Sequence, residues 1–221
     1  MLAAPPRSFS GGVVARRPHL PGAPLGARDL QLLVWVSEQY AVRVDQIAVL
    51  RGCGERAAQY TVARLRAAGL LELWRPLVGQ ANWVLLTAAG QRLAGTGYRR
   101  WVPRLGLLAH VAAVCDVRLQ VQRRSPGSVW VCERQLARER EHPSEHVADG
   151  LVLSAGREDV VEVELTVKSA GRIEEIIDGL SARYTSVVYF AAPQVRRRVE
   201  QLGGVERWPL LQIRELPAGP A

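Results

Sequence analysis

A helical pattern gives way to a strand pattern within residues 64–71, which read RLRAAGLL. Just before and within this stretch, Ala58, Val62 and Leu65 recur at helical spacing and form the apolar face of a helix over residues 55–68. Gly69 ends the helix, because glycine readily adopts the left-handed conformation that closes many helices. The stretch is typical of folds in which a third helix ends and the chain turns directly into a β-hairpin.

The segments around this junction have the order of a small helical domain with a hairpin. Thr87 is expected to cap the closing helix, since its hydroxyl can accept a hydrogen bond from the first turn. In chain order the sequence predicts helices over residues 27–40, 45–52 and 55–68, strands over 70–74 and 83–86, and a helix over 88–93. Three helices, a hairpin and a closing helix are the elements of a winged helix–turn–helix, which we expect at residues 27–98.

The rest of the chain divides into an arm, a linking helix and a second domain. Residues 1–26 are rich in proline, glycine, alanine and arginine without periodicity, which predicts a flexible arm. Residues 99–127 contain a helix at about 104–123 that either bridges the two domains or pairs with a second copy. Residues 128–216 have the order β-β-β-α-β-α-β, which predicts a small α/β domain with a central mixed sheet. The expected fold class of the whole chain is therefore α+β.

Charge is distributed unevenly along the 221 residues. Residues 1–124 hold 17 arginines against 6 acidic residues, whereas residues 125–221 hold 12 basic and 15 acidic residues. The first part is thus suited to binding a polyanion such as nucleic acid. No apolar run is long enough for a membrane span and no apolar signal segment follows Met1, so we expect a soluble, cytoplasmic protein without a membrane partner. The three cysteines form no CxxC pair, which argues against a zinc ribbon.

Polar side chains of the predicted third helix point away from its apolar face. The candidates for the major groove of double-stranded DNA are Arg56, Gln59, Tyr60 and Arg64. The candidates for phosphate contacts from the hairpin are Arg75, Gln80 and Asn82. The alternative is that this domain serves only for dimerisation or protein docking.

Two carboxylates share one face of the predicted strand at residues 160–167. By the period of two, Glu162 and Glu164 face opposite to the valines on either side of them. If this face of the sheet is exposed to water, the two carboxylates are accommodated at little cost in free energy. The functional alternative adds Asp149, which starts the preceding strand, and Lys168. Oxygen ligands of this kind suit Mg²⁺, so Asp149, Glu162 and Glu164 are candidate metal ligands, and with Lys168 they are candidate catalytic residues.

This arrangement resembles the PD-(D/E)XK nuclease-like pattern of restriction endonucleases and resolvases. Residues 27–202 as a whole resemble the actinobacterial replication-relaxation family associated with plasmids. The motifs that carry the resemblance are Leu108-Ala109-His110, the Trp130–Arg134 strand ending in Glu-Arg, Ala148-Asp149-Gly150, and Glu162-Val163-Glu164. The resemblance implies a nuclease-like second domain and a role in replication or relaxation.

The chain departs from the nuclease pattern at its lysine. The pattern requires Glu-x-Lys, whereas Lys168 comes four residues after Glu164. Four residues of regular strand span roughly 13 Å, so the two side chains meet only if the chain bends, for example at residues 169–171. A fold that binds DNA without cleaving it is an equally good interpretation.

The segment His142-Pro143-Ser144-Glu145-His146 fits HxxEH, an inverted zinc-peptidase signature. That chemistry needs both histidines on one face of a firm helix, and Pro143 allows at best the opening of one. We therefore expect a solvated turn here and no zinc site. His110, a lone histidine beside an apolar stripe, is expected to be a packed structural residue.

Three functional hypotheses follow from the sequence. The first is a DNA-binding protein of a plasmid or mobile element, acting in replication, relaxation or transfer, with duplex DNA and the replication or relaxation machinery as partners. The second is a Mg²⁺-dependent endonuclease that uses Asp149, Glu162, Glu164 and Lys168. The third is a transcriptional regulator that forms a homodimer.

Overall fold

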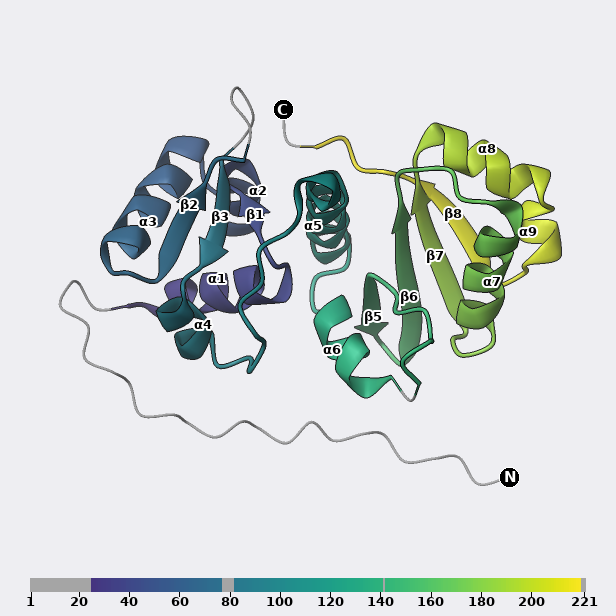
Figure 1. Cartoon of the computed structure of the whole chain (residues 1–221), viewed down its shortest axis with the longest axis horizontal. Coiled ribbons are helices and arrows are strands. Elements are labelled where there is room, and N and C mark those ends of the chain that lie inside the picture. The colour runs from purple at the N-terminus through teal and green to yellow at the C-terminus, as the bar shows by residue number, and fades with distance from the viewer. Residues whose placement is uncertain (1–24, 77–81, 141, 220–221) are drawn as a thin grey trace.

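The computed structural model describes residues 25–76, 82–140 and 142–219. Within these ranges the chain is α+β, with nine α-helices, a three-stranded sheet and a mixed five-stranded sheet. Figure 1 shows the two sheets on opposite sides of one long helix, α5 (Leu108–Arg124). Across the described ranges no helix has both the length and the apolar character to cross a membrane. The predicted arm lies outside the described residues up to residue 24, as does Gln80.

The N-terminal unit packs helices against the small antiparallel sheet. Its sheet has the order β1-β3-β2, so the first strand pairs with the third. The elements are α1 (Ala27–Glu38), β1 (Val42–Arg43), α2 (Val44–Arg51), α3 (Glu55–Ala67), β2 (Leu71–Trp74), β3 (Trp83–Leu86) and α4 (Ala88–Ala94). The predicted helices and strands are present. Strand β1 was not predicted, because two residues are too short to show a period.

Gly69, Thr87 and the apolar residues of α3 have the structural roles that the sequence predicts. Gly69 has a φ of +70° directly after α3, which lets the chain reverse into β2. Thr87 caps α4 by accepting a hydrogen bond of 3.0 Å from the backbone of Gly90. Ala58, Val62 and Leu65 are buried in the core of the unit.

Helix α5 is buried on two opposite faces. Cys115 and Leu119 pack into the core of the N-terminal unit, whereas Val114 and Val117 pack against the five-stranded sheet. A helix that is apolar on opposite sides has to lie between two layers. The structure thus favours the bridging role for this helix. The two buried faces leave it no broad apolar side with which to pair with a second copy.

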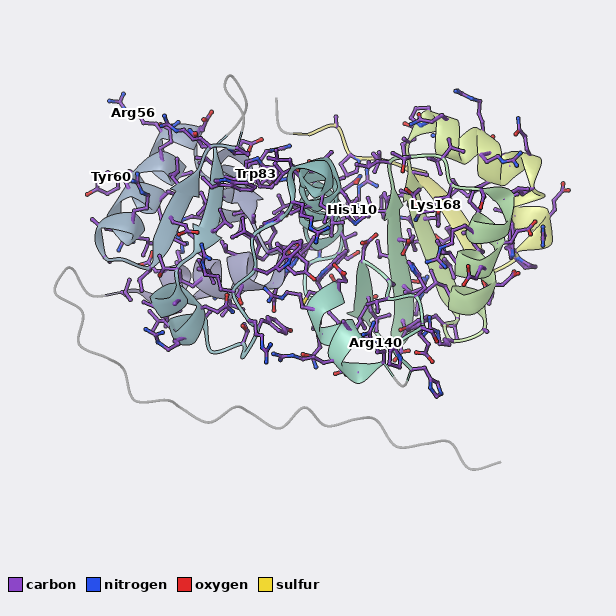
Figure 2. The ribbon with its side chains drawn as sticks, viewed as in Figure 1. Arg56, Tyr60, Trp83, His110, Arg140 and Lys168 are labelled. Carbon is purple, nitrogen blue, oxygen red and sulfur yellow. The ribbon has the colours of Figure 1, made fainter. Side chains whose placement is uncertain are left out.

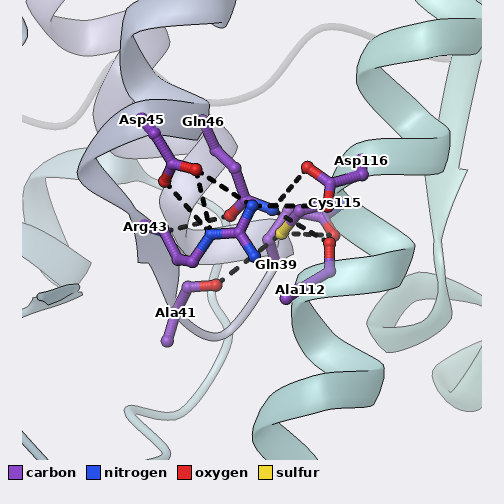
Figure 3. A network of polar contacts seen from close by, with 8 residues as sticks. All are labelled: Gln39, Ala41, Arg43, Asp45, Gln46, Ala112, Cys115 and Asp116. Atoms are coloured by element: carbon purple, nitrogen blue, oxygen red, sulfur yellow. Dashed lines mark hydrogen bonds and ion pairs between the residues drawn. The ribbon is translucent and has the colours of Figure 1, made fainter. Parts of the chain in front are cut away.

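Polar contacts also fasten α5 to the N-terminal unit (Figure 3). The side-chain amide of Gln46 on α2 donates to the carbonyl oxygen of Ala112 at 2.9 Å and to Asp116 at 2.8 Å. Arg43 donates to Asp45 at 3.1 Å and to Asp116 at 3.4 Å. Gln46 is completely buried, so these hydrogen bonds compensate for its removal from water.

The C-terminal unit is built on a sheet of order β4-β5-β6-β7-β8. Strands β4 to β6 are antiparallel, and β7 and β8 continue the sheet in parallel with β6. Helix α5 covers one face and helices α7 and α8 cover the other. The elements are β4 (Val129–Cys132), α6 (Glu133–Glu139), β5 (Gly150–Ser154), β6 (Arg157–Glu164), α7 (Ala170–Ser181), β7 (Ser186–Ala191), α8 (Pro193–Gln201), α9 (Gly204–Arg207) and β8 (Leu211–Glu215).

The bounds of β6 differ from those predicted. The turn before it is confined to Ala155 and Gly156, which both have positive φ, so the strand begins at Arg157 rather than at residue 160. It ends at Glu164 rather than at residue 167. The early end determines how far Lys168 lies from the carboxylates.

Candidate functional site

Three carboxylates gather beside β5 and β6, and we call them the carboxylate cluster: Asp149, Glu162 and Glu164. The pairing of Gly150 with Val161 extends to place Asp149 opposite Glu162, while Glu164 lies two residues further along the same strand face. All three are buried, with exposed fractions of 8%, 3% and 5%. A solvated sheet face is therefore the wrong interpretation, and the structure brings the predicted residues together.

Two histidines contact the cluster from outside the sheet. His110 Nε2 lies 2.8 Å from Asp149 Oδ1, and His146 Nε2 lies 2.9 Å from Glu162 Oε2. The other oxygen of Asp149 accepts a 2.7 Å hydrogen bond from the backbone N–H of Val163. Buried carboxylates need such partners, since an unpaired buried charge is very costly. His110 is thus an ion-pair partner of the cluster, and its side chain is 36% exposed rather than packed in a core.

Lys168 reaches the cluster because β6 stops short of it. Its ammonium group forms an ion pair with Glu164, four residues earlier. The chain turns at once after Glu164, whose side chain accepts hydrogen bonds of 3.3 Å from the backbone and the hydroxyl of Thr166. Glu164 and Lys168 are therefore not held apart by the roughly 13 Å that four residues of regular strand would span. The bend occurs directly after the strand, before residues 169–171.

The charges of the cluster shift the pKa values of its members. Burial, together with the negative charge of Asp149, raises the pKa of Glu162 to about 7 against the opposing effect of His146. Burial lowers the pKa of His110, but the hydrogen bond and charge of Asp149, helped by Glu162 and Glu133, outweigh it and raise the pKa to about 9. Burial and the charge of Asp149 also raise the pKa of Glu133. His110 therefore carries a proton at neutral pH.

Tyr189 lies beneath the cluster with its hydroxyl unused. It pairs in register with Glu162 across β6 and β7, and it is completely buried. Within the described ranges its hydroxyl has no hydrogen-bond partner. A buried hydroxyl without a partner costs about 1–3 kcal/mol, so the cluster is not fully satisfied as it stands.

The described residues contain no group of three or more His, Cys, Asp or Glu side chains arranged to hold a metal ion. The oxygen donors of the carboxylate cluster suit Mg²⁺, but His110, His146 and Lys168 already occupy the three carboxylates. The HxxEH segment forms no helix from His142 onward, as expected. Its second histidine is nevertheless part of the site, because His146 pairs with Glu162. Sequence reasoning did not assign His146 or Glu133 to the site, although His146 ends the HxxEH segment and Glu133 lies in the Trp130–Arg134 motif.

The exposed face of α3 carries several of the predicted DNA-binding residues. Arg56, Gln59 and Tyr60 are exposed, and the side chain of Tyr60 is 73% accessible. Figure 2 shows Arg56 and Tyr60 projecting away from the rest of the molecule. Arg64 differs, because its guanidinium donates to Asp29 on α1 at 2.6 Å. Its charge is therefore already compensated within the fold.

Arg66 lies on the exposed face of α3 and was missed by sequence reasoning. It lines a cleft of about 350 Å³ together with Gln59 and Asn82. Arg75 is exposed at the end of β2. The signal that could have identified Arg66 is its helical spacing from Gln59, seven residues earlier.

The sequence matches no protein-family model and no curated protein. Among solved structures, the crystal structure of protein VC1899 from Vibrio cholerae is similar with a TM-score of 0.32 and 12% sequence identity. The similarity covers 86% of this chain and 53% of that protein, so the chain spans about half its length. A similarity this weak carries no argument about function.

Proposed function

We propose that the chain is a DNA-binding protein of a plasmid or mobile element. It would bind double-stranded DNA through a winged helix–turn–helix at residues 27–98. The exposed face of α3, with Arg56, Tyr60 and Arg66, is the observation that carries this proposal. The order of elements in the N-terminal unit supports it, since α3 follows α2 after a short turn and leads into the hairpin of β2 and β3. The resemblance to plasmid replication-relaxation proteins supports a role in replication, relaxation or transfer.

The distribution of paired and unpaired arginines supports the choice of this face. Arg43, Arg51 and Arg64 of the N-terminal unit form ion pairs with aspartates of the fold. In the described part of the chain, the guanidinium groups of Arg56 and Arg66 form no hydrogen bond or ion pair. Unpaired arginines on an exposed helix can contact phosphates or the guanine edge without breaking an internal contact.

Duplex binding measured as a function of salt tests the proposal. We expect the affinity of the protein for a mixed-sequence duplex to fall steeply with salt, because binding releases counterions. Arg56→Ala and Arg66→Ala should each weaken binding and reduce the slope of log affinity against log salt by about 1 if the residue contacts a phosphate. Arg92→Ala, an exposed arginine of α4, is the matched control. The proposal fails if the protein does not bind duplexes at low salt.

A second candidate function is Mg²⁺-dependent cleavage of DNA, favoured by the convergence of the carboxylate cluster with Lys168. Asp149 and Glu162 would hold the ion, with Glu164 next to Lys168. A bound Mg²⁺ supplies charge stabilisation at a phosphate. His146 would have to move from Glu162 before this carboxylate could hold an ion.

Nicking of supercoiled plasmid separates the two functions. A nuclease should nick the plasmid with Mg²⁺ or Mn²⁺, and Glu162→Gln should abolish the activity without changing duplex affinity. Absence of nicking by the wild-type protein with either ion would eliminate cleavage and leave the binding function standing. A transcriptional regulator of the third kind would form a stable homodimer. The mass of the protein in solution tests for this dimer.

A further inference from the structure

A second basic surface lies away from α3, at the junction of the two units. It is a cleft of about 800 Å³ between the segment before η1 (Leu105–Leu107), the start of α5, and α6. Its walls include Tyr98, Arg99, Trp101, Leu107, His110 and Arg134. We call it the junction cleft. Its volume falls within the range of roughly 300–1,000 Å³ that is common for ligand sites.

Aromatic rings and guanidinium groups alternate along one wall of the junction cleft. Trp101 meets Tyr40 edge to face, with ring centroids 4.8 Å apart. Arg134 lies over Tyr40 at 4.6 Å and over Tyr98 at 4.7 Å, and Arg138 lies over Tyr98 at 4.3 Å. Arg134 and Arg138 also donate to backbone carbonyl oxygens of Ser37 and Gly97, so the stack is firmly held. The side chain of Trp101 forms the outer end of the stack and is 39% exposed.

The junction cleft carries uncompensated positive charge. Four arginines line it, with Glu133 as the carboxylate among the residues of its wall. Arg100 is paired with Glu72, but Arg134 bonds to neutral carbonyl groups and retains its charge. In the described residues the guanidinium of Arg99 has no hydrogen-bond or ion-pair partner, and it is exposed.

The floor of the junction cleft leads to the carboxylate cluster. His110 and Glu133 line both the cleft and a smaller hollow behind it, and Asp149 lines that hollow. Figure 2 shows His110 on α5, between the N-terminal unit and the strands of the C-terminal sheet. A ligand in the cleft would thus lie between the N-terminal unit and the buried carboxylates.

We propose that the junction cleft binds single-stranded DNA, with an unpaired base stacked on Trp101 and a neighbouring phosphate held by Arg99. An exposed aromatic ring beside unpaired arginines is the combination that binds single strands without sequence preference. In a duplex the bases are paired and stacked on one another, so their faces are not available to Trp101. The positive charge of the cleft favours a polyanion as the ligand. This inference extends the proposed function to a second site and a second form of DNA.

Binding of a short fluorescent oligo(dT) at low salt tests the inference. Trp101→Ala and Arg99→Ala should each weaken oligo(dT) binding, with Trp101→Ala weakening it about tenfold or more, since stacking of one base on an aromatic ring contributes that much. Trp101→Phe keeps an aromatic ring and should recover a part of the affinity. Arg92→Ala is the control for a general loss of positive charge. Circular dichroism and the melting temperature of each variant show that the fold is retained.

The same proteins are measured with a hairpin duplex. Tyr60→Ala should weaken duplex binding and Trp101→Ala should weaken oligo(dT) binding, so each variant affects a different ligand.

Oligo(dT) binding that is equal for wild type, Trp101→Ala and Arg99→Ala overturns the junction cleft as its site. Duplex binding without oligo(dT) binding also overturns it while leaving the proposed function intact. Oligo(dT) binding without duplex binding supports the cleft and overturns the proposed function. Competition by free dTMP at the same concentration as oligo(dT) would show a mononucleotide pocket and overturn the single-strand assignment.

Discussion

His110 and Asp149 form an ion pair of 2.8 Å that joins the first turns of α5 to the start of β5. The two residues are 39 positions apart in sequence, and each belongs to a different layer of the molecule. The pair has a second consequence beyond fastening α5. It places a protonated imidazole at the edge of the carboxylate cluster, so the charge state of the site and the stability of the fold depend on the same proton.

The free energy of unfolding should fall as the pH rises through the neutral range. The folded protein holds a proton on His110 up to about pH 9, whereas the unfolded chain releases it near the ordinary pKa of 6.5. The stabilisation from His110 is therefore complete below pH 6.5 and is lost as the pH rises through 9. Glu162 acts in the same direction at lower pH, since its pKa rises from 4.5 to about 7 and the unfolded chain loses the proton first.

Urea unfolding at several pH values between 4.5 and 9 measures this dependence. His110→Gln should flatten the curve between pH 6.5 and 9, and Glu162→Gln should flatten it between pH 4.5 and 7. A His110→Gln protein that keeps the wild-type slope above pH 6.5 would contradict the raised pKa of His110.

Gln46 should be among the polar residues most important for stability. Gln46→Leu would leave the carbonyl of Ala112 and the carboxylate of Asp116 without this donor, and we expect a loss of about 2–3 kcal/mol. Backbone amides of α2 and α5 should exchange faster with solvent, because the substitution loosens the contact between them. Gln201→Leu, on the exposed side of α8, is the control and should change stability by less than about 0.5 kcal/mol. Equal effects of the two substitutions would show that the Gln46 network contributes little.

Arg118 should be replaceable by methionine more readily than by alanine. Its guanidinium bonds to Glu38 at 2.5 Å and lies 5.0 Å from the ring centroid of Trp35, but its Nε and Nη1 atoms are buried without a partner in the described residues. Methionine keeps most of the volume and removes these unsatisfied donors, so we expect a cost of about 1 kcal/mol or less. Alanine leaves a cavity and should cost about 3 kcal/mol. Denaturant midpoints compare the two, and an equal loss would mean that the ion pair with Glu38 stabilises the fold more than the packing of the side chain does.

Two Gly→Ala substitutions in helices should have opposite effects. A Cβ at Gly90 in α4 would lie 2.0 Å from the backbone oxygen of Leu70, so the helix has to move away from the backbone just before β2 and about 3 kcal/mol should be lost. A Cβ at Gly179 in α7 meets no atom within 4 Å, and alanine there should stabilise the protein by about 0.5–1 kcal/mol. Thermal unfolding of both variants checks the sign of each change. Destabilisation by Gly179→Ala would contradict the open space around that position.

The parts of the fold that the sequence predicted are those set by local periodicity. Helix α3 and strand β2 follow from the spacing of apolar residues and from Gly69, and the cap by Thr87 depends on residues three positions apart. The convergence of Asp149, Glu162 and Glu164 was also predictable, because strand pairing fixes which residues lie opposite each other. These features depend on neighbours in sequence or on one hairpin.

The remaining features depend on contacts between distant segments. Helix α6 has one buried residue, Leu136, so it shows no apolar period. Arg64 was assigned to the exposed face of α3, but its partner Asp29 lies 35 residues earlier and no local pattern connects them. The contact of Lys168 with Glu164 depends on where β6 ends, which the packing of the whole sheet determines.

Burial of α5 on both sides has a consequence for any attempt to dissect the protein. Whichever fragment retains this helix would present a strip of valines, or of cysteine and leucine, to water, and the other fragment would lack one wall of its interior. Neither fragment would be a self-sufficient folding unit, and heat or denaturant should melt the protein in a single cooperative step.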